Sequence, residues 1–437
     1  MIGSMAATPS PPPSPASYPF RLRIAERLPA TADLVVVGGG VVGCATALAA
    51  TGAGLRTVVI DARPRPATLT TPAATGAFRL QFDNAEELAL VREGIDFMDD
   101  VAARTGLPGY DIGLVRRGYL FCAFEEASTI RQRSIVELQR TFGLDDVEIL
   151  SGDETRARFP YVSPDVRQSR FRQGDGTLDQ VRLAWAYALG ASNGQGVQRP
   201  AGTAAASFAL GIQVTGFRMA PDGHRLEAVE TTGGEISAPL VVLATGPFLA
   251  ATAALAGVSL DIRPTRRQKV VLPEVPEVPP DAPMTIDEEN ATHWRPALRG
   301  AFLLCTEPGT ATSEPVWEVP GSPEFAFRLL DPASPLSAAR LSPFWADSWE
   351  RGDRWYLQAG QYEYTPDRRP YIGRVGPEGL AVNGGYSGHG VMSSAGGSRL
   401  LLDLLLDRDT APPGGLRAAD DPFRVDRPMP EREFDLL

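Results

Sequence analysis

The sequence has few of the residues that bind metals or form disulfides, with only three cysteines and three histidines among 437 residues. Cys44, Cys122 and Cys305 are odd in number and far apart. This excludes a disulfide framework and predicts a reducing compartment, which we take to be the cytoplasm. The histidines are scattered along the chain, so we expect no metal centre.

Positive charge is also scarce, because 42 lysines and arginines stand against 53 acidic residues and the net charge is −11. Nucleic-acid binding requires a basic surface, so we expect no nucleic-acid partner. The two long uncharged stretches, 34–55 and 236–260, are interrupted by glycines or prolines. Each pattern predicts a buried strand, a turn and a small-residue helix rather than a membrane span. We therefore expect a soluble protein with no membrane partner.

Residues 1–30 begin with a tract of proline, serine and alanine that cannot form a packed core, so we expect a disordered tail. The tail lacks the charged and apolar regions of a secretory signal. Arg21, Arg23 and Arg27 leave a transit peptide open as an alternative.

The most informative segment begins with Leu34–Val37, an apolar run typical of a strand buried on both faces of a parallel sheet. Gly38, Gly40 and Gly43 follow in G-x-G-x-x-G spacing, and small residues then continue at helical length. The first glycine permits a sharp turn, the second lets a pyrophosphate approach the backbone, and the third lets helix and strand pack closely. The N-terminus of the helix supplies N–H groups and positive potential for phosphates.

A second strand is predicted at 57–60, and it ends in Asp61. A carboxylate at this place accepts hydrogen bonds from the ribose hydroxyls of an adenosine and argues against a 2′-phosphate. Strand, glycines, helix, strand and acid in this order predict a dinucleotide site. They do not separate NAD from FAD.

Nucleotide-type units recur at 31–61, 236–256 and 380–406. The stretches between them have the pattern of a second unit with antiparallel strands, including 301–305 and 325–329. The length of the chain predicts two or three domains. This interleaving is unusual for a simple NAD dehydrogenase.

Eight short motifs occur in order across residues 31–406: VVVGGGVVGCATALAATG, TGAFRLQF, RRGYLFCA, GDGTLD, PLVVLATGPF, RPTRRQKVV, YEYTPDRRPYIG and GGYSGHGVMSSAGG. Together they resemble the D-amino-acid-oxidase-like flavoproteins, which include sarcosine oxidase, glycine oxidase, and dimethylglycine and proline dehydrogenase subunits. The resemblance implies an α/β fold in which a Rossmann-like FAD-binding domain is interleaved with an α+β, antiparallel-sheet substrate domain. The implied division is a tail (1–30), an FAD-binding domain (31–100, 163–262 and 363–420), a substrate domain (101–162 and 263–362) and a C-terminal tail (421–437).

The resemblance also implies that FAD lies extended, with its adenosine at Asp61 and its flavin ring beside the start of a C-terminal helix. The N-terminus of that helix would stabilise the negative charge that develops on the ring. Sarcosine oxidase holds its flavin through a cysteine, and the matching position is Gly360, so non-covalent binding is implied. The implied FAD-binding residues are Gly38, Gly40, Val41, Gly43, Asp61, Ala62, Thr75, Gly76, Val214, Ala244, Gly246, Gly388, His389, Gly390, Val391 and Met392.

The implied reaction is hydride transfer from the amine-bearing carbon of a secondary amine or amino acid to flavin N5, which gives an imine that hydrolyses. We expect a carboxylated small-molecule amine, because arginine binds a carboxylate bidentately. The candidate arginines are Arg79, Arg295 and Arg267. Tyr362 matches a family active-site tyrosine that orients the substrate, and His389 is expected to be a structural donor beside the flavin.

The sequence departs from the monomeric oxidases of the family in its substrate site. Their oxygen-activating lysine matches Leu303, their carboxylate-binding lysine matches Met392, and a second arginine matches Phe82. The electron acceptor and the identity of the amine therefore stay open. His293 is a further candidate for the pocket, whereas Lys269 is expected to be an exposed strand residue.

Two other functions remain open on the same fold, oxidation of a 2-hydroxy acid and a non-catalytic FAD-binding assembly factor. A dehydrogenase that uses only NAD agrees least with the interleaved pattern. The oligomeric state is not predicted.

Overall fold

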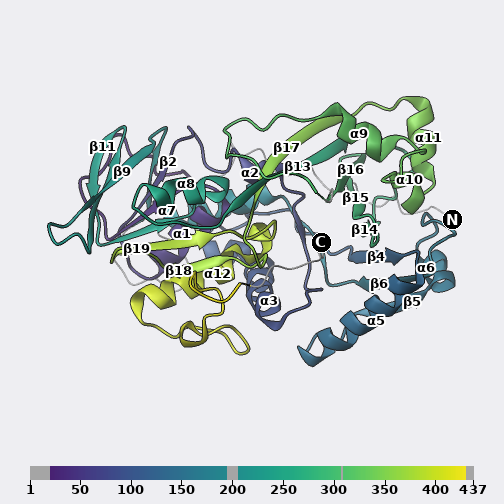
Figure 1. Ribbon diagram of the computed structural model, residues 1–437, viewed down its shortest axis with the longest axis horizontal. Coiled ribbons are helices and arrows are strands. Elements are labelled where there is room, and N and C mark those ends of the chain that lie inside the picture. The colour runs from purple at the N-terminus through teal and green to yellow at the C-terminus, as the bar shows by residue number, and fades with distance from the viewer. Residues whose placement is uncertain (1–19, 194–204, 307–308, 430–437) are drawn as a thin grey trace, which may run out of the picture.

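The computed structural model describes residues 20–193, 205–306 and 309–429. The chain passes back and forth between a part built on a six-stranded sheet and a part built on an eight-stranded sheet (Figure 1). Of the predicted N-terminal tail, residues 1–19 lie outside the described residues. Its last residues are part of the fold, since the backbone of Ile24 pairs with that of Phe208.

The six-stranded sheet is parallel except for one edge strand, β18. Leu34 and Val36 of β1 pack with helices on one face, whereas Val35 and Val37 pack against strands on the other. Burial on both faces explains why this strand is continuously apolar. The strands in spatial order are β18 (Tyr371–Arg374), β19 (Leu380–Gly384), β12 (Leu240–Leu243), β1 (Leu34–Val37), β2 (Thr57–Asp61) and β8 (Ser207–Leu210).

Helices cover one face of this sheet, and a small antiparallel sheet covers the other. α3 lies close against α12 because Gly94 faces the carbonyl of Met392, where a Cβ would overlap the oxygen. The helices are α1 (Val41–Gly52), α3 (Ala85–Asp99), α4 (Val101–Thr105), α7 (Gln180–Asn193) and α12 (Gly390–Leu406). The other face carries β9 (Val214–Met219), β10 (Leu226–Thr231), β11 (Gly234–Ser237), a 3-10 turn (Gly246–Phe248) and α8 (Leu249–Ala254).

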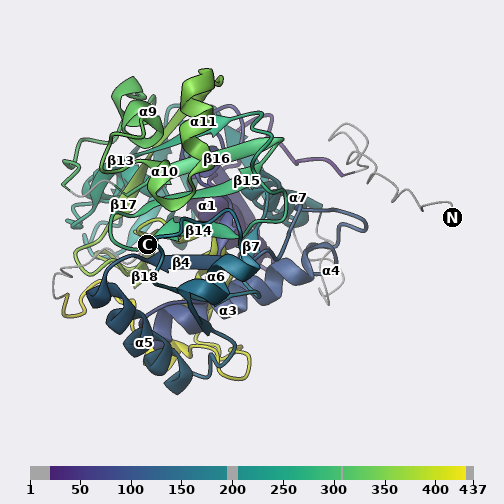
Figure 2. The ribbon, with the colours of Figure 1, turned by 90° about the vertical axis from the view of Figure 1, so that its right-hand side faces the viewer.

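The eight-stranded sheet is antiparallel except where β14 pairs with β4. Helices α9 to α11 group beside β14 to β16, whereas α5 lies along β4 to β6 (Figures 1 and 2). The strands in spatial order are β17 (Tyr356–Tyr364), β13 (Arg263–Leu272), β16 (Gly300–Cys305), β15 (Thr292–Ala297), β14 (Met284–Asp287), β4 (Tyr119–Ala123), β6 (Gln168–Arg172) and β5 (Glu148–Ser151). The helices are α5 (Glu126–Thr141), α6 (Gly152–Arg158), α9 (Pro323–Leu330), α10 (Ala338–Leu341) and α11 (Phe344–Arg351).

Short elements connect the two parts. α2 (Thr70–Ala73) contacts both α7 and β17, and β3 (Ala77–Phe78) pairs with β7 (Gly176–Thr177). A further 3-10 turn, Ala418–Asp420, contacts α12. The segment around residues 70–78 therefore lies where the two sheets meet.

The predicted strand at 325–329 is wrong, because these residues belong to α9. Phe325, Ala326 and Leu329 are buried there, and their i, i+1, i+4 spacing is helical. Pro323 occupies the first turn, where a helix tolerates it.

The predicted domain boundaries stay a prediction, but two segments differ from them. The range 163–262 contains β6, which pairs with β4 and β5 in the eight-stranded sheet. The predicted C-terminal tail contains Phe423, which is fully buried and accepts a hydrogen bond from the N–H of Ile372. Composition did not reveal either contact, because both depend on partners distant in the sequence.

Within the described ranges, no helix has the length and apolar character needed to cross a bilayer. The three cysteines are free and buried, which agrees with the predicted absence of a disulfide framework.

Candidate active site

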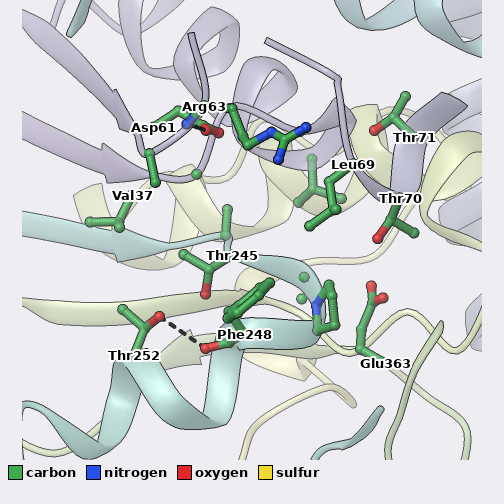
Figure 3. A pocket seen from close by; sticks show the side chains of 18 of the residues that line it. Val37, Asp61, Arg63, Leu69, Thr70, Thr71, Thr245, Phe248, Thr252 and Glu363 are labelled. Carbon is green, nitrogen blue, oxygen red and sulfur yellow. Dashed lines mark hydrogen bonds between the residues drawn. The ribbon is translucent and has the colours of Figure 1, made fainter. Parts of the chain in front are cut away.

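A cavity of about 510 Å³, here called the main cavity, lies at the carboxyl ends of β1, β2 and β12. Open α/β sheets bind their ligands at this edge. Asp61 and Arg63 lie at one end of the view, and Thr70 and Glu363 lie at the opposite end beyond Phe248 (Figure 3). The main cavity therefore extends from the six-stranded sheet to β17 of the other sheet.

The glycine motif places bare backbone against the main cavity at the start of α1. Gly38 has a φ of +108°, and a Cβ on it would overlap the carbonyl group of Ala244. Gly43 does not line the cavity but packs against the Gly38 carbonyl, which leaves no room for a Cβ. Gly40 and Val41 line the cavity where the helix begins. The N–H of Val41 donates to the Thr71 hydroxyl at 3.2 Å, and the remaining N–H groups of the first turn are available to a ligand.

Asp61 ends β2 at one end of the main cavity. Its Oδ2 accepts a hydrogen bond from the N–H of Gly39 at 2.5 Å, and its Oδ1 accepts one from the N–H of Arg63 at 2.7 Å. Burial raises the pKa of this carboxyl, and the two N–H donors oppose that shift. Ala62 and Val214 line the same cavity.

The start of α12 forms the other end of the main cavity. Gly388, Gly390 and Val391 line it together with Tyr362 from β17. Gly388 has a φ of +97°, and a Cβ on it would lie 2.5 Å from the Tyr362 ring, so glycine is required here. The N-termini of α1 and α12 thus face one cavity, and both favour bound negative charge.

These residues fit FAD. Glycine backbone is available for a pyrophosphate, a carboxylate for a ribose, and a second helix N-terminus for the flavin ring. The hydroxyl of Thr245 lines the cavity, and it is buried without a hydrogen-bond partner among the described residues. Ala244 and Gly246 line the same wall. Gly360 has no side chain to which a flavin could be attached, which agrees with the non-covalent binding that is typical of the family.

Besides Gly43, four residues predicted to bind FAD do not line the main cavity. Thr75, His389 and Met392 line a second cavity, and Gly76 lines neither, because it packs against Gln180 and the Leu178 carbonyl. Successive residues of a turn point in different directions, so a neighbour of a cavity residue can face elsewhere.

Glu363 is a half-buried carboxyl at the cavity wall that sequence reasoning did not single out. It follows Tyr362 on β17 and lines the main cavity opposite Thr70 (Figure 3). Burial raises its pKa from 4.5 to about 7. The carboxyl is therefore neutral in mildly acidic solution and ionises near neutral pH.

We expect Glu363→Gln to remove part of the pH dependence of folding in the flavin-free protein. Because the pKa of Glu363 is raised in the folded state, its protonated form stabilises the fold. This contribution to the free energy of unfolding is fully present below pH 4.5 and is lost as the pH rises through about 7. The variant should gain roughly 2 to 3 kcal/mol of unfolding free energy relative to wild type between pH 5 and pH 8. Urea unfolding at the two pH values measures this gain. The exposed Glu137→Gln is the matched control, and an equal gain in both variants would contradict the assignment.

The second cavity, here called the side cavity, has a volume of about 130 Å³ and adjoins the main cavity, since Tyr362 and Gly388 line both. It lies on the face of the eight-stranded sheet, and seven strands from β17 to β6 contribute to its lining. Its lining includes four arginines and two acidic residues, namely Arg79, Arg170, Arg267, Arg368, Asp83 and Glu87. The side cavity is therefore a cationic pocket beside the main cavity.

Arg79 is 4% exposed and lines the side cavity. Its Nη1 donates to the Gln81 carbonyl at 2.5 Å, and its guanidinium lies 4.4 Å from the centre of the Phe82 ring. Burial lowers its pKa, yet an arginine stays protonated in proteins. No carboxylate of a described residue is within ion-pair distance, so Arg79 can bind an anionic ligand.

Two further arginines gather around Tyr364. Arg267 donates from Nε to the Tyr364 hydroxyl at 3.0 Å, and its buried Nη1 has no hydrogen-bond partner among the described residues. Arg368 stacks on the same ring at 3.9 Å and has a φ of +62°. Backbone strain of this kind gathers at functional sites.

His389 lines the side cavity at the N-terminus of α12. Its Nδ1 lies 3.3 Å from Oε1 of Glu87, and its ring meets the edge of Phe82 with 5.0 Å between ring centres. Glu87 is itself held by the Asn84 amide at 2.6 Å. His389 is thus fixed between α3 and α12 where the two cavities meet.

His293 also lines the side cavity. Its Nδ1 lies 2.9 Å from the Ala291 carbonyl, which can only accept a hydrogen bond, so Nδ1 carries the proton. Burial lowers the pKa of His293 to about 4. At neutral pH its Nε2 is therefore an unprotonated acceptor.

Arg295, predicted to bind substrate, lines neither cavity. Its guanidinium donates to the Thr75 carbonyl, with Nε at 2.8 Å. Lys269 is only 2% exposed, so the expectation of an exposed lysine is wrong, and its Nζ donates to the Ala74 carbonyl at 2.9 Å. Burial lowers the pKa of Lys269 to about 7. Both side chains therefore donate to backbone carbonyls of the segment between α2 and β3 and fix its position.

Sequence reasoning missed several residues of the side cavity, among them Tyr119, Arg170 and Arg368. Tyr119 and Arg170 lie on β4 and β6, which pair only once the sheet is formed. Two of the quoted motifs, RRGYLFCA and TPDRRPYIG, contain Tyr119 and Arg368, but a motif does not show which side chains point inward.

The comparisons with known proteins agree with this geometry. A family model described as FAD dependent oxidoreductase matches residues 33–404. Mitochondrial sarcosine dehydrogenase of Mus musculus is 26% identical over 390 residues, which cover 85% of this chain and 39% of that protein. Glycine oxidase of Geobacillus kaustophilus is 25% identical over 389 residues, which cover 87% of this chain and 94% of the enzyme. The chain therefore spans about two fifths of the sarcosine dehydrogenase that it matches.

Solved structures show the same fold. The crystal structure of glycine oxidase from Geobacillus kaustophilus superposes with a TM-score of 0.73 at 24% identity, covering 91% of this chain and 99% of that one. L-Proline dehydrogenase from P. horikoshii gives a TM-score of 0.71 at 20% identity, covering 91% and 96%. The fold class predicted from the motifs is confirmed. The family model matches residues 33–404, and two helices that begin with glycines face the main cavity. The chain therefore belongs to the D-amino-acid-oxidase-like family of FAD-dependent oxidoreductases.

Proposed function

We propose that this chain oxidises the C–N bond of a small amine that carries a carboxylate. The observation that carries the proposal is the junction of the two cavities, where Tyr362 and Gly388 line both. A substrate bound by Arg79 in the side cavity would meet a flavin ring bound in the main cavity. A cationic pocket next to the redox group favours a carboxylated substrate.

FAD, when bound, supplies a hydride acceptor, and the residues of the chain bind and orient the amine. Arg79 binds the carboxylate, and the Tyr362 hydroxyl orients the substrate at the junction. Nε2 of His293 accepts a hydrogen bond from the amine N–H. The C–H electron pair leaves with the hydrogen as hydride while the nitrogen lone pair forms the C=N bond, and water then hydrolyses the imine. A neutral amine needs no separate base.

The relatives support this substrate class, because sarcosine, glycine and L-proline, after which they are named, are all carboxylated amines. We further propose a cytoplasmic location, which the three free, buried cysteines support.

The proposal predicts that a carboxylated secondary amine reduces the bound flavin in the absence of oxygen. Purified holoprotein would be mixed anaerobically with secondary amines, amino acids and 2-hydroxy acids, and the loss of oxidised-flavin absorbance would be followed. At least one carboxylated amine should bleach the flavin completely, whereas 2-hydroxy acids should leave it oxidised.

Two outcomes would overturn the proposal. Reduction by a 2-hydroxy acid with no response to amines would assign a different reaction to the same site. No reduction by any compound, with dithionite still bleaching the flavin, would favour a non-catalytic FAD-binding protein.

A further inference from the structure

Arg170 is a buried arginine of the side cavity that the proposed reaction does not use. It lies on β6, is 2% exposed, and has its guanidinium 4.2 Å from the centre of the Phe121 ring. Its Nε has no hydrogen-bond partner among the described residues, and none of their carboxylates is within ion-pair distance. An unpaired buried charge is costly, and binding an anion would offset the cost.

The acidic group that acts most strongly on Arg170 is already used elsewhere. Glu288 raises the pKa of Arg170 at longer range, but it pairs with Arg131 at 3.5 Å and accepts a hydrogen bond from the Gln132 amide at 2.5 Å. Burial lowers the pKa of Arg170 to about 10, so the guanidinium is charged at neutral pH. Arg170 is therefore a charged residue of the side-cavity wall with no carboxylate partner among the described residues.

Arg170 and Tyr362 lie on the two outermost of the strands that line the side cavity. The lining strands run from β17, which carries Tyr362, to β6, which carries Arg170, with five strands between them. Arg79 is nearer the junction, since Phe82, on which it stacks, also contacts His389. Arg79 and Arg170 line the same cavity and lie close enough for the charge of Arg79 to lower the pKa of Arg170, so one small ligand can contact both.

We propose that Arg170 binds a second anionic group, so that the substrates are amines with two carboxylates, one bound by Arg79 and the other by Arg170. This inference rests on the proposed function of the side cavity. The charges support it, because the four arginines exceed the two acidic residues of the lining by two. A single carboxylate would leave one buried guanidinium uncompensated.

The test compares ligands that differ only in the second carboxylate. Succinate and glutarate are titrated into the holoprotein beside butyrate and pentanoate, and the change in the flavin absorbance spectrum gives each dissociation constant without turnover. We expect each dicarboxylate to bind about 10- to 100-fold more tightly than its monocarboxylate partner. Arg170→Gln should abolish this difference and leave monocarboxylate binding unchanged within about twofold.

Two variants separate the roles of the arginines. Arg79→Gln should weaken both ligands of a pair, because it removes the site for the first carboxylate. Arg299→Gln, at an arginine 79% exposed, should change neither and serves as the charge-matched control. The melting temperature of flavin-free Arg170→Gln should equal or exceed that of wild type, because the substitution removes an unpaired buried charge.

Several results would overturn this inference. These are equal affinity of wild type for both ligands of each pair, equal weakening of both ligands by Arg170→Gln, or a lower melting temperature of that variant, which would indicate a structural role. These experiments also distinguish failure of the proposed reaction from failure of the role given to Arg170. Arg170-dependent dicarboxylate binding without flavin reduction by any amine would contradict the reaction alone, whereas reduction by monocarboxylated amines without dicarboxylate preference would contradict Arg170 alone.

Discussion

Gly43→Ala is expected to yield a protein that purifies without bound flavin. A Cβ at this position would overlap the carbonyl oxygen of Gly38, so the start of α1 must move away from β1. That movement would displace the N–H groups available to the pyrophosphate of FAD at the start of α1, and overpacking of this kind costs about 1 to 3 kcal/mol in stability. The dissociation constant of FAD should rise at least about tenfold, since a loss of more than 1.4 kcal/mol in binding is a factor of ten. The flavin content per chain, measured from the ratio of absorbance at the flavin band to that at 280 nm, should fall well below the wild-type value.

Gly52→Ala is the matched control, because it makes the same substitution in the same helix. A Cβ at Gly52 meets no atom within 4 Å, and alanine favours helix. This variant should retain its flavin and its melting temperature. Circular dichroism of Gly43→Ala should still show folded secondary structure. Full flavin content in Gly43→Ala would contradict the role given to the glycine motif.

Arg79→Gln is expected to lower kcat/KM for a carboxylated amine by about 30-fold or more, because losing one partner of a buried charge pair costs about 2 to 5 kcal/mol. Glutamine keeps part of the side-chain stem but removes the charge. The loss should appear mainly as a higher KM if the arginine binds the carboxylate equally throughout the reaction. Steady-state kinetics with a carboxylated amine and its uncharged amide measure the effect.

The amide is the internal control for Arg79. It lacks the negative charge, so Arg79→Gln should change its kcat/KM by less than about threefold, and Arg79→Lys should recover part of the loss for the carboxylate. Equal losses for both substrates would mean that Arg79 supports the fold of the side cavity rather than binding substrate.

The nucleotide-binding half of the fold was predictable because its signals are local. A buried strand, three spaced glycines and a terminal acid occur within Leu34–Asp61, and each reflects a constraint on the backbone at that point. The glycines before α12 carry the same kind of signal, because Gly388 has a left-handed backbone conformation that favours glycine at this position.

The substrate half was less predictable because its site is assembled from distant strands. Arg170 occurs in an ordinary-looking strand, and its position across the side cavity follows from pairing with β4. Arg295 and Lys269 have the residue types expected of a substrate site or an exposed strand, but burial directs both toward carbonyls behind the cavity. Residue type alone does not show to which side of a strand a cation points.

The separation of Gly38 and Gly388 in the chain has a consequence for biosynthesis. Chains leave the ribosome from the N-terminus and fold progressively, but both ends of the main cavity exist only after the last nucleotide-binding segment has emerged. FAD can therefore be enclosed only after the residues around Gly388 have left the ribosome. Chains that terminate before residue 388 lack the start of α12 and cannot enclose it.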